Sequence, residues 1–256
     1  MDGFGRKKAI KSGEERVRYF FVKPEEFAQE TVLLTGNQAH HLSRVLRLQP
    51  GDYLELLDGR GQAAHARIES VGKVVCCRKE EIYWPPGRPS LRVTLWQGLA
   101  KGEKMDQIIQ KSVELGVSRI IPLTCERSVV RLNKAGDKKE RWQKIAMEAA
   151  QQCRRPDLPL VEEAQSLPQA LEQLKGLLLV LWEEEKQAGF RQLWQMPAPE
   201  EVSLLIGPEG GLTPQEVNLA KDRGARVLTL GSRILRTETA GPTALALLMH
   251  GWGDLA

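Results

Sequence analysis

The chain has 256 residues, of which 41% are hydrophobic and 27% charged, and a formal net charge of +4. These proportions are typical of a soluble globular protein with enough material for one large domain or two smaller ones. No run approaches the roughly 18 apolar residues of a membrane span, and the basic N-terminus lacks the apolar segment of a secretory signal, so neither a membrane protein nor a secreted one is predicted.

The first third of the sequence predicts a small β-barrel. Residues 1–17 are polar and basic and are interpreted as a disordered extension. Beyond them, one helical pattern at 40–48 interrupts a series of short strand patterns, of which the last three are separated by turns of hairpin length. Such an arrangement is typical of a small barrel. A proline-rich connector at 84–89 marks the domain boundary. The strand patterns lie at 19–22, 53–57, 62–68 and 74–78.

After the connector, strand and helix patterns alternate, which indicates an α/β domain with helices on both faces of the sheet. The helix pattern at 105–113 ends before Gly116, a residue suited to the position just after a helix. The segment 240–249 is apolar on nearly all sides, so it is expected either deep inside the monomer or at a subunit interface. The strand patterns lie at 91–95, 119–122, 177–182 and 202–206, with a further helix at 142–149.

Two glycine-bearing loops lie close together near the C-terminus, each between a strand pattern and a helix pattern. The first is 206–211, and the capping box of Thr213, Pro214 and Glu216 fixes where the next helix begins. The second is 230–240. Glycine lets a ligand approach the backbone without meeting a Cβ, and ligands in open α/β sheets collect beyond the carboxyl ends of strands. One such loop is an ordinary turn, but the pair predicts a cofactor site.

Motifs for several other chemistries are absent from the sequence. There is no GxxxxGK[ST], GxGxxG or HExxH motif, and the four histidines form no ligand-like cluster, so no metal is predicted. The four cysteines form no CxxC pair, which favours a reducing, cytoplasmic location over a disulfide framework. Residues 101–155 contain thirteen lysines or arginines against seven acidic residues. This excess favours a polyanionic partner, although solvated helix faces carry similar charge.

With the two loops in place, the sequence resembles the SAM-binding (S-adenosylmethionine-binding) half of SPOUT-class RNA methyltransferases, and more narrowly the 16S ribosomal RNA uracil-N3 methyltransferase family. Two departures stand out: Gln151 and Arg154 replace an acidic residue and a glycine of the family pattern, and Gly241-Pro242 follows the second loop, where it is expected to shift the start of the last helix. The motifs that carry the resemblance are 18–20, 41–47, 104–106, 114–117, 126–128, 152–155, 206–211 and 230–240.

The resemblance implies the fold and the partners. We expect an RNA-binding, PUA-like β-barrel at 18–85 and a SPOUT α/β domain with a trefoil knot at 90–256, working as a homodimer. The implied cofactor is SAM, and the implied substrate is 16S ribosomal RNA within the small ribosomal subunit. No membrane partner is expected.

The resemblance also implies the site. Backbone groups of three loops, which follow Trp182, Ile206 and Leu230, would hold SAM. The full cofactor set is Trp182, Ile206, Gly207, Glu209, Gly210, Gly211, Leu230, Gly231, Ile234, Leu235, Thr239 and Ala240. The RNA-contact candidates are Arg18, Arg44, Arg47, Arg127 and Arg155, because arginine binds phosphate through two hydrogen bonds and stacks on bases.

Three residues are candidates for catalysis. Uracil must lose its N3 proton before or during methyl transfer, so a base or a positive field would lower the barrier. Arg236 would supply the field, while Glu209 or Glu238 would take the proton or hold Arg236 in place. In the alternative interpretation, Glu238 caps a helix and Arg236 pairs with a carboxylate.

Two other functions remain open from the sequence. The same SAM site would serve an enzyme acting on another RNA, such as a ribose hydroxyl of transfer RNA. A non-catalytic ribosome-assembly protein with a degenerate methyltransferase domain is the second alternative, and the intact pair of loops argues against it.

Overall fold

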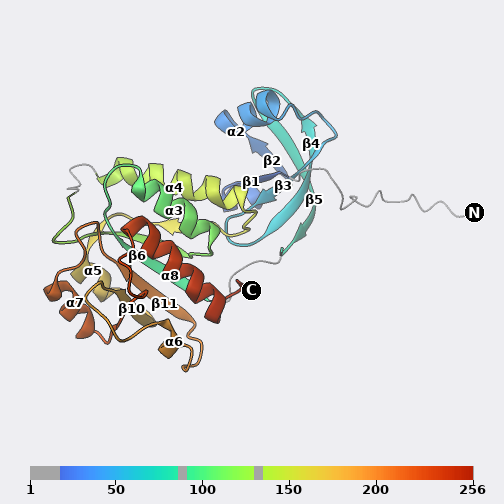
Figure 1. Cartoon of the computed structure of the whole chain (residues 1–256). Helices are drawn as coiled ribbons and strands as arrows, with labels where there is room; N and C mark the ends of the chain where they lie inside the picture. Colours follow the sequence, from blue (N-terminus) through green and yellow to red (C-terminus); the bar gives the residue numbers. More distant parts are fainter. Residues whose placement is uncertain (1–17, 86–90, 130–134, 256) are drawn as a thin grey trace, which may run out of the picture. The chain divides into compact units, whose positions relative to one another are not determined.

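The computed structural model describes residues 18–85, 91–129 and 135–255 (Figure 1). The predicted extension at 1–17 and most of the proline-rich connector lie outside these ranges. The chain divides into two compact units, of which the first holds the described residues up to Asp58 and Ala63–Tyr83. The second holds Gly59–Gln62 and the chain from Trp84 onward. The boundary lies beside the predicted connector, but the short turn Gly59–Gln62, predicted to belong to the barrel, groups with the second unit.

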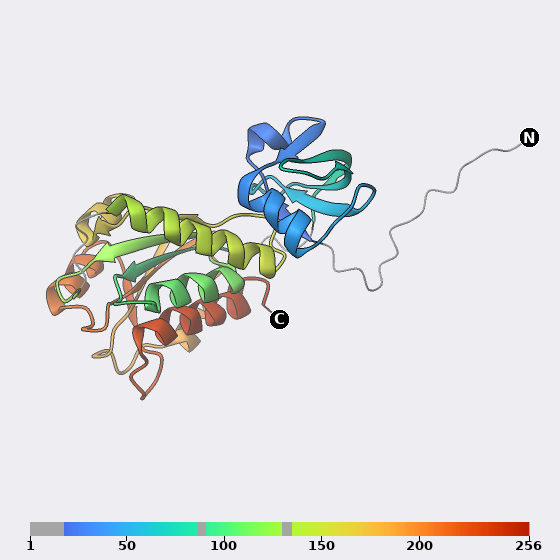
Figure 2. The same ribbon diagram turned by 90° about the horizontal axis from the view of Figure 1, so that it is seen from above.

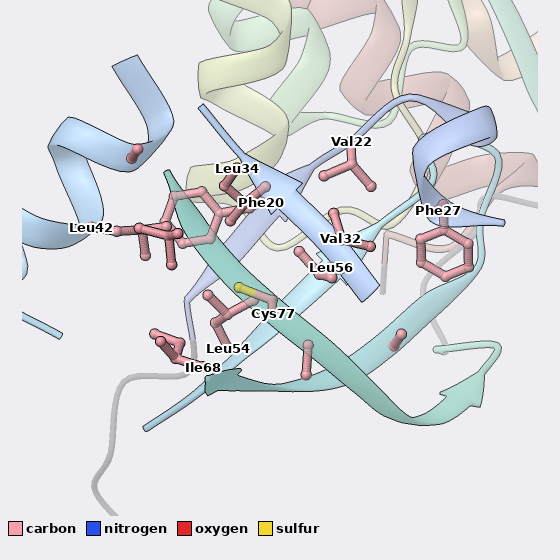
Figure 3. Packing of buried hydrophobic residues seen from close by; sticks show 14 residues of the cluster. Phe20, Val22, Phe27, Val32, Leu34, Leu42, Leu54, Leu56, Ile68 and Cys77 are labelled. Atoms are coloured by element: carbon pink, nitrogen blue, oxygen red, sulfur yellow. The ribbon is translucent and has the colours of Figure 1, made fainter. Parts of the chain in front are cut away.

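The first unit is a five-stranded sheet with strand order β1-β3-β4-β5-β2, in which only the β1–β3 pair is parallel. Alternate residues of the strands point into one core, which Figure 3 shows between the strands and the helical insert. Its elements are β1 (Tyr19–Phe21), α1 (Pro24–Phe27), β2 (Thr31–Leu34), α2 (Gly36–His40), the π-helix η1 (His41–Val45), β3 (Tyr53–Leu57), β4 (Ala63–Ser70) and β5 (Val75–Tyr83).

The helical insert differs from the single helix predicted at 40–48. An α-helix begins four residues earlier and changes at His41 into a π-turn, which ends before Arg47 with a φ of 53°. Ser43 donates a hydrogen bond from its hydroxyl to the Ala39 carbonyl at 2.8 Å, a contact that bends helices. Leu42 is fully buried in the core, so packing holds this irregular turn in place.

The second unit is a parallel sheet with strand order β12-β10-β11-β6-β7-β8, and β9 also pairs with β7. Helices α3, α4 and α8 pack together on one face, while α5 and α7 cover the other (Figures 1 and 2). The elements are β6 (Arg92–Gly98), α3 (Lys104–Glu114), β7 (Arg119–Thr124), α4 (Ala135–Gln152), β8 (Leu160–Val161), β9 (Gln165–Ser166), α5 (Leu167–Glu172), β10 (Leu177–Leu181), α6 (Phe190–Leu193), β11 (Glu201–Ile206), α7 (Pro214–Lys221), β12 (Arg226–Leu228) and α8 (Thr237–Trp252).

The strand order brings distant segments together. Strand β11 lies between β10 and β6, with Leu204 opposite both Leu179 and Leu95. All these strands are parallel, so their carboxyl ends share one edge of the sheet. The predicted α/β domain is confirmed; the trefoil knot that the resemblance implies stays a prediction.

Helix α8 begins at Thr237 and contains Pro242, so the proline does not delay the start of the helix as expected. The monomer buries one side of it, including Leu245 and Leu248. The opposite side, which includes Leu247, is only half-buried in the monomer.

The end of α4 explains the glycine expected at position 154. Arg154 has a φ of 61°, and the Arg155 N–H bonds the Ala150 carbonyl at 2.9 Å while the Arg154 N–H bonds that of Gln151. This is the Schellman pattern, whose left-handed residue is usually glycine because other residues meet their own Cβ there. The equivalent residue after α3 is Gly116, with a φ of 94°.

We therefore expect Arg154→Gly to stabilise the protein by about 1 kcal/mol, because the left-handed conformation costs a non-glycine residue roughly that much. Urea unfolding followed by circular dichroism measures the difference. The reverse change, Gly116→Arg, is the matched control and should destabilise. Equal stability of Arg154→Gly and the wild type would contradict the explanation.

Candidate cofactor and active site

A cavity of about 480 Å³ lies at the carboxyl edge of the parallel sheet. Its walls are the loops that follow β10, β11 and β12, which are adjacent strands of the sheet, together with the start of α8. This volume is within the usual range for small-molecule sites. The two glycine loops predicted to form a pocket do lie together, and the loop after Trp182 completes it.

The structure places eleven of the twelve predicted cofactor residues in the cavity wall. The exception is Thr239, which is exposed in the first turn of α8 and donates its backbone N–H to the Arg236 carbonyl at 2.8 Å. The residues that do line the cavity are Trp182, Ile206, Gly207, Glu209, Gly210, Gly211, Leu230, Gly231, Ile234, Leu235 and Ala240.

The glycines of the two loops have different tasks. Gly211 has a φ of 71°, and a Cβ there would lie 2.2 Å from a carboxylate oxygen of Glu183. Glu183 is not among the site residues predicted from the sequence. Gly231 has a φ of 112° and faces open space, so its backbone is accessible to a ligand. Trp182 donates its indole N–H to the Leu212 carbonyl at 3.3 Å and thereby joins the loop after β10 to the end of the first glycine loop. Open backbone between apolar side chains fits a nucleoside ligand.

The predicted capping box is confirmed at the start of α7. Thr213 accepts the Glu216 N–H at 3.3 Å, and the Glu216 carboxylate accepts the Thr213 N–H at 2.9 Å. The other oxygen of this carboxylate accepts the Glu126 N–H at 2.9 Å. The box therefore fixes the end of the first glycine loop and also binds the loop after β7.

The three predicted catalytic residues meet at one side of the cavity. Arg236 precedes α8, and its guanidinium is 82% exposed and lies 3.9 Å from Glu238 Oε1. Glu238 is largely buried, in the first turn of α8. The alternative pairing of Arg236 with a carboxylate is thus present as one long contact, whereas Glu238 does not cap the helix.

Glu209 has partners from a segment that sequence reasoning missed as part of the site. Its Oε1 accepts the Lys101 N–H at 2.9 Å and lies 3.1 Å from Lys104 Nζ. Burial alone would raise the pKa of Glu209, but the Lys101 N–H, its own N–H and the Lys104 ammonium together lower it below its ordinary value. The resemblance did include Lys104, yet no local signal placed it at the cavity.

A buried hydrogen-bond chain ties the cavity walls together. Gln97 Nε2 donates to Thr237 Oγ1 at 2.9 Å, and this hydroxyl donates to the Gly207 carbonyl at 2.7 Å. Gln97 and Thr237 are both buried. The chain therefore joins β6, the start of α8 and the first glycine loop.

We expect Thr237→Val to destabilise the protein by about 2–3 kcal/mol, because it leaves a buried amide donor and a buried carbonyl without their partner. Thr237→Ser keeps the hydroxyl and should cost less than about 1 kcal/mol, which makes it the matched control. Urea unfolding of both variants measures the effect. A loss in Thr237→Val no greater than that in Thr237→Ser would contradict the stabilising role assigned to the hydroxyl.

The RNA-contact candidates do not share one environment. Arg44 and Arg47 are exposed in the first unit, where Arg18 is half-buried and donates to the Leu46 carbonyl at 3.5 Å. In the second unit, Arg127 is exposed and donates to the Gly210 carbonyl at 3.2 Å, beside the cavity.

Arg155 differs from the other RNA-contact candidates in being buried. It is only 6% exposed, and its guanidinium donates two hydrogen bonds to Asp157 and one to the Val113 carbonyl. These three hydrogen bonds hold the end of α4 to α3, so the contacts of Arg155 stabilise the fold. The sequence could not distinguish it from a surface arginine, because its partners come from the fold.

Comparisons with known proteins agree with this geometry. A family model described as an RNA methyltransferase domain matches residues 87–249, and one described as an RNA methyltransferase PUA domain matches residues 34–74. This chain belongs to the RNA methyltransferase family. The resemblance inferred from the sequence is therefore confirmed, as is the order of a PUA-like domain followed by a parallel-sheet α/β domain.

Members of the family cover nearly the whole chain. Ribosomal RNA small subunit methyltransferase E of Bacillus subtilis is 35% identical over 245 residues, which are 91% of this chain and 96% of that protein. The protein of the same name from Neisseria gonorrhoeae, solved bound to S-adenosylmethionine, is 33% identical with a TM-score of 0.85, covering 94% of this chain and 100% of that one. A methyltransferase from Legionella pneumophila, solved with bound SAM, is 34% identical with a TM-score of 0.86 over the same shares.

The described ranges lack two further features. No helix among these residues has the length and apolarity needed to cross a membrane. Within the same ranges, no three His, Cys, Asp or Glu side chains form a group able to hold a metal ion.

Proposed function

We propose that this protein binds SAM in the cavity and transfers its methyl group to N3 of a uracil in 16S ribosomal RNA of the small ribosomal subunit. The observation that carries the proposal is the cavity itself, which three loops form at the carboxyl ends of β10, β11 and β12. Relatives named for methylation of small-subunit ribosomal RNA, and solved with this cofactor, support it. All four cysteines are free, in keeping with a cytoplasmic site of action.

The cavity residues suit the proposed cofactor. Open backbone at Gly231 would lie against the nucleoside, and the apolar side chains of Leu181, Ile206 and Leu228 would enclose it. Bound SAM would supply a methyl group activated by a positively charged sulfur. Transfer of this methyl group to uracil N3 would release the N3 proton, so a side chain at the cavity would have to accept it.

Glu238 suits the role of base better than Glu209. The Oε1 of Glu209 is already engaged by the Lys101 N–H and the Lys104 ammonium, and its lowered pKa makes it a weaker base. Among the described residues, the ion-pair partner of Glu238 Oε1 is the distant Arg236 guanidinium at 3.9 Å, while Lys104 lies 3.6 Å from the other oxygen, Oε2. Arg236 would then stabilise the negative charge that develops on the uracil ring.

The decisive experiment is incubation with SAM and small ribosomal subunits, followed by mass analysis of the RNA nucleosides. The proposal expects 3-methyluridine. A ribose-methylated nucleoside, or product formed only with transfer RNA, would support the other enzymatic function instead. SAM binding without any product would favour a non-catalytic assembly protein, and the absence of SAM binding would reject the proposed site.

RNA binding is proposed to use Arg18, Arg44, Arg47 and Arg127. We expect the affinity for 16S RNA to fall steeply with salt, since each neutralised phosphate adds roughly −0.7 to the slope of log affinity against log salt for single strands. Arg44→Ala with Arg47→Ala should therefore make the slope shallower by about 1.4, as measured by filter binding. Arg226→Ala, an exposed change at the amino end of β12, is the control. An unchanged slope in the double variant would remove these two arginines from the RNA surface.

The homodimer is also a proposal. The side of α8 that the monomer leaves half-buried includes Leu247 and Ala246, which are apolar and suit contact with a second copy. Sedimentation equilibrium should give twice the monomer mass of 28.7 kDa. Leu247→Glu should shift the equilibrium to monomers, and a wild-type monomer at micromolar concentration would reject the dimer.

A further inference from the structure

One cation joins three separate segments at the side of the cavity. Lys104 is the first residue of α3, and its Nζ lies 3.1 Å from Glu209 Oε1 and 3.6 Å from Glu238 Oε2. Glu209 belongs to the loop after β11, and Glu238 to the first turn of α8. Among the described residues that line the cavity, Lys104 is the only one that precedes β10 in the chain.

The position is an unfavourable one for a lysine considered alone. The amino end of a helix carries partial positive charge, so a cation in the first turn is repelled there. Two carboxylates that face the same point also repel one another. Each cost is removed only when the ammonium lies between the two acids, as it does here.

Glu238 depends most on this ammonium. Its Oε2 is buried and accepts no hydrogen bond among the described residues, a state that costs a carboxylate oxygen free energy. Lys104 is the cation beside this oxygen, whereas Arg236 lies nearer the other oxygen. The buried oxygen is therefore held by Lys104, and Oε1 is left for other contacts.

Two of these segments, the first glycine loop and the start of α8, are also joined by a buried contact that includes β6. Gln97, Thr237 and the Gly207 carbonyl form the buried hydrogen-bond chain described above. Backbone of the glycine loop also packs directly on Gly98, where a Cβ would lie 2.4 Å from Pro208 N. The relative position of this loop and α8 is thus set by a polar junction at the surface and by close packing beneath it.

We propose that Lys104 is a positioning residue whose ammonium holds Glu209 and Glu238 together and so fixes the first glycine loop against the start of α8. The cavity wall then has its cofactor-binding shape before SAM arrives. This inference rests on the proposed SAM site, but its first test does not require SAM.

The first test is a carbon-13 NMR titration of the Glu209 carboxyl in the free protein. Lys104 of α3 contacts the Glu209 carboxylate directly, and Glu238 of α8 contacts the same ammonium. The further charged groups nearby are Arg236, which lies beside Glu238, and Arg127, which lies beside Gly210. Lys104→Met should raise the pKa of Glu209, since a cation that favours its ionised form is lost, while Lys104→Arg should keep it low. If the titration midpoint of Glu209 is the same in Lys104→Met as in the wild type, the inference is overturned, whether or not the wild type binds SAM.

The second test is the affinity for SAM, measured by calorimetry. We expect Lys104→Met to weaken binding about tenfold, Lys104→Arg to restore it to within about threefold, and Lys104→Met with Glu209→Gln to bind better than Lys104→Met alone. The double variant keeps an oxygen for the Lys101 N–H but removes the repulsion between the acids. If Lys104 instead touched SAM directly, Glu209→Gln would give no relief, and that result overturns the positioning role. Wild-type affinity in Lys104→Met also overturns it, whereas a wild type that binds no SAM rejects the proposed function alone.

Discussion

Replacing Gly98 with alanine is expected to weaken SAM binding at least a hundredfold, which corresponds to about 2.7 kcal/mol. The added Cβ would lie 2.4 Å from Pro208 N, 2.6 Å from Pro208 Cδ and 2.8 Å from the Gly207 carbonyl carbon. Two of these are backbone atoms of the first glycine loop, which cannot rotate away as the end of a side chain can. The loop must therefore move, and the overpacking itself should cost about 1–3 kcal/mol of stability.

Calorimetry with SAM and thermal unfolding measure the two effects separately. Gly72→Ala is the matched control, since a Cβ at Gly72 would lie at an ordinary 3.7 Å from the Val74 carbonyl oxygen. This variant should bind SAM like the wild type. If Gly98→Ala did so too, the close approach of β6 to the glycine loop would have no part in shaping the cavity.

Arg236→Ala should reduce kcat by roughly 10²–10³-fold, the usual cost of losing a group that stabilises developing negative charge. The Kd for SAM should stay within about twofold of the wild type. The guanidinium is largely exposed and makes one ion pair, at 3.9 Å, so its removal leaves the cavity wall intact. Single-turnover methylation of 16S RNA measures the rate, and calorimetry measures the SAM affinity.

Arg233→Ala is the control for a general loss of positive charge, because Arg233 lines the same cavity from the same loop. Arg233→Ala should lose much less activity than Arg236→Ala. Unchanged turnover in Arg236→Ala would remove the catalytic role, and equal losses of turnover and SAM affinity would assign Arg236 to cofactor binding.

The features of the site that could be predicted from the sequence are those encoded locally. Glycines that end a strand pattern, followed by the Thr213 capping box, define a loop and the start of a helix within about ten residues. The same reasoning located the turn at Gly116, whose left-handed φ needs no distant partner. Such signals predicted the two glycine loops and, through the resemblance, the cofactor.

The rest of the site depends on the order of strands in the sheet. Lys104 reaches the cavity, and Gly98 packs against its first glycine loop, because β11 lies next to β6, although more than a hundred residues separate these strands. The spacing of side chains within β6 or β11 does not indicate that these two strands pair. Arg155 is the converse case: a basic residue beside Arg154 looks like part of a charged surface until Asp157 and the Val113 carbonyl are found at its guanidinium.

The placement of α8 has a consequence for the order in which the protein becomes active during synthesis. Thr237 and Glu238 are supplied by α8, which follows β12 in the chain, and both are needed to close the junction with the glycine loop. A nascent chain that has emerged only as far as β12 would contain all three strands whose loops line the cavity. It would lack the α8 residues that complete the cavity wall. Capture of the methyl donor should therefore begin only after α8 has left the exit tunnel and packed beside the glycine loop.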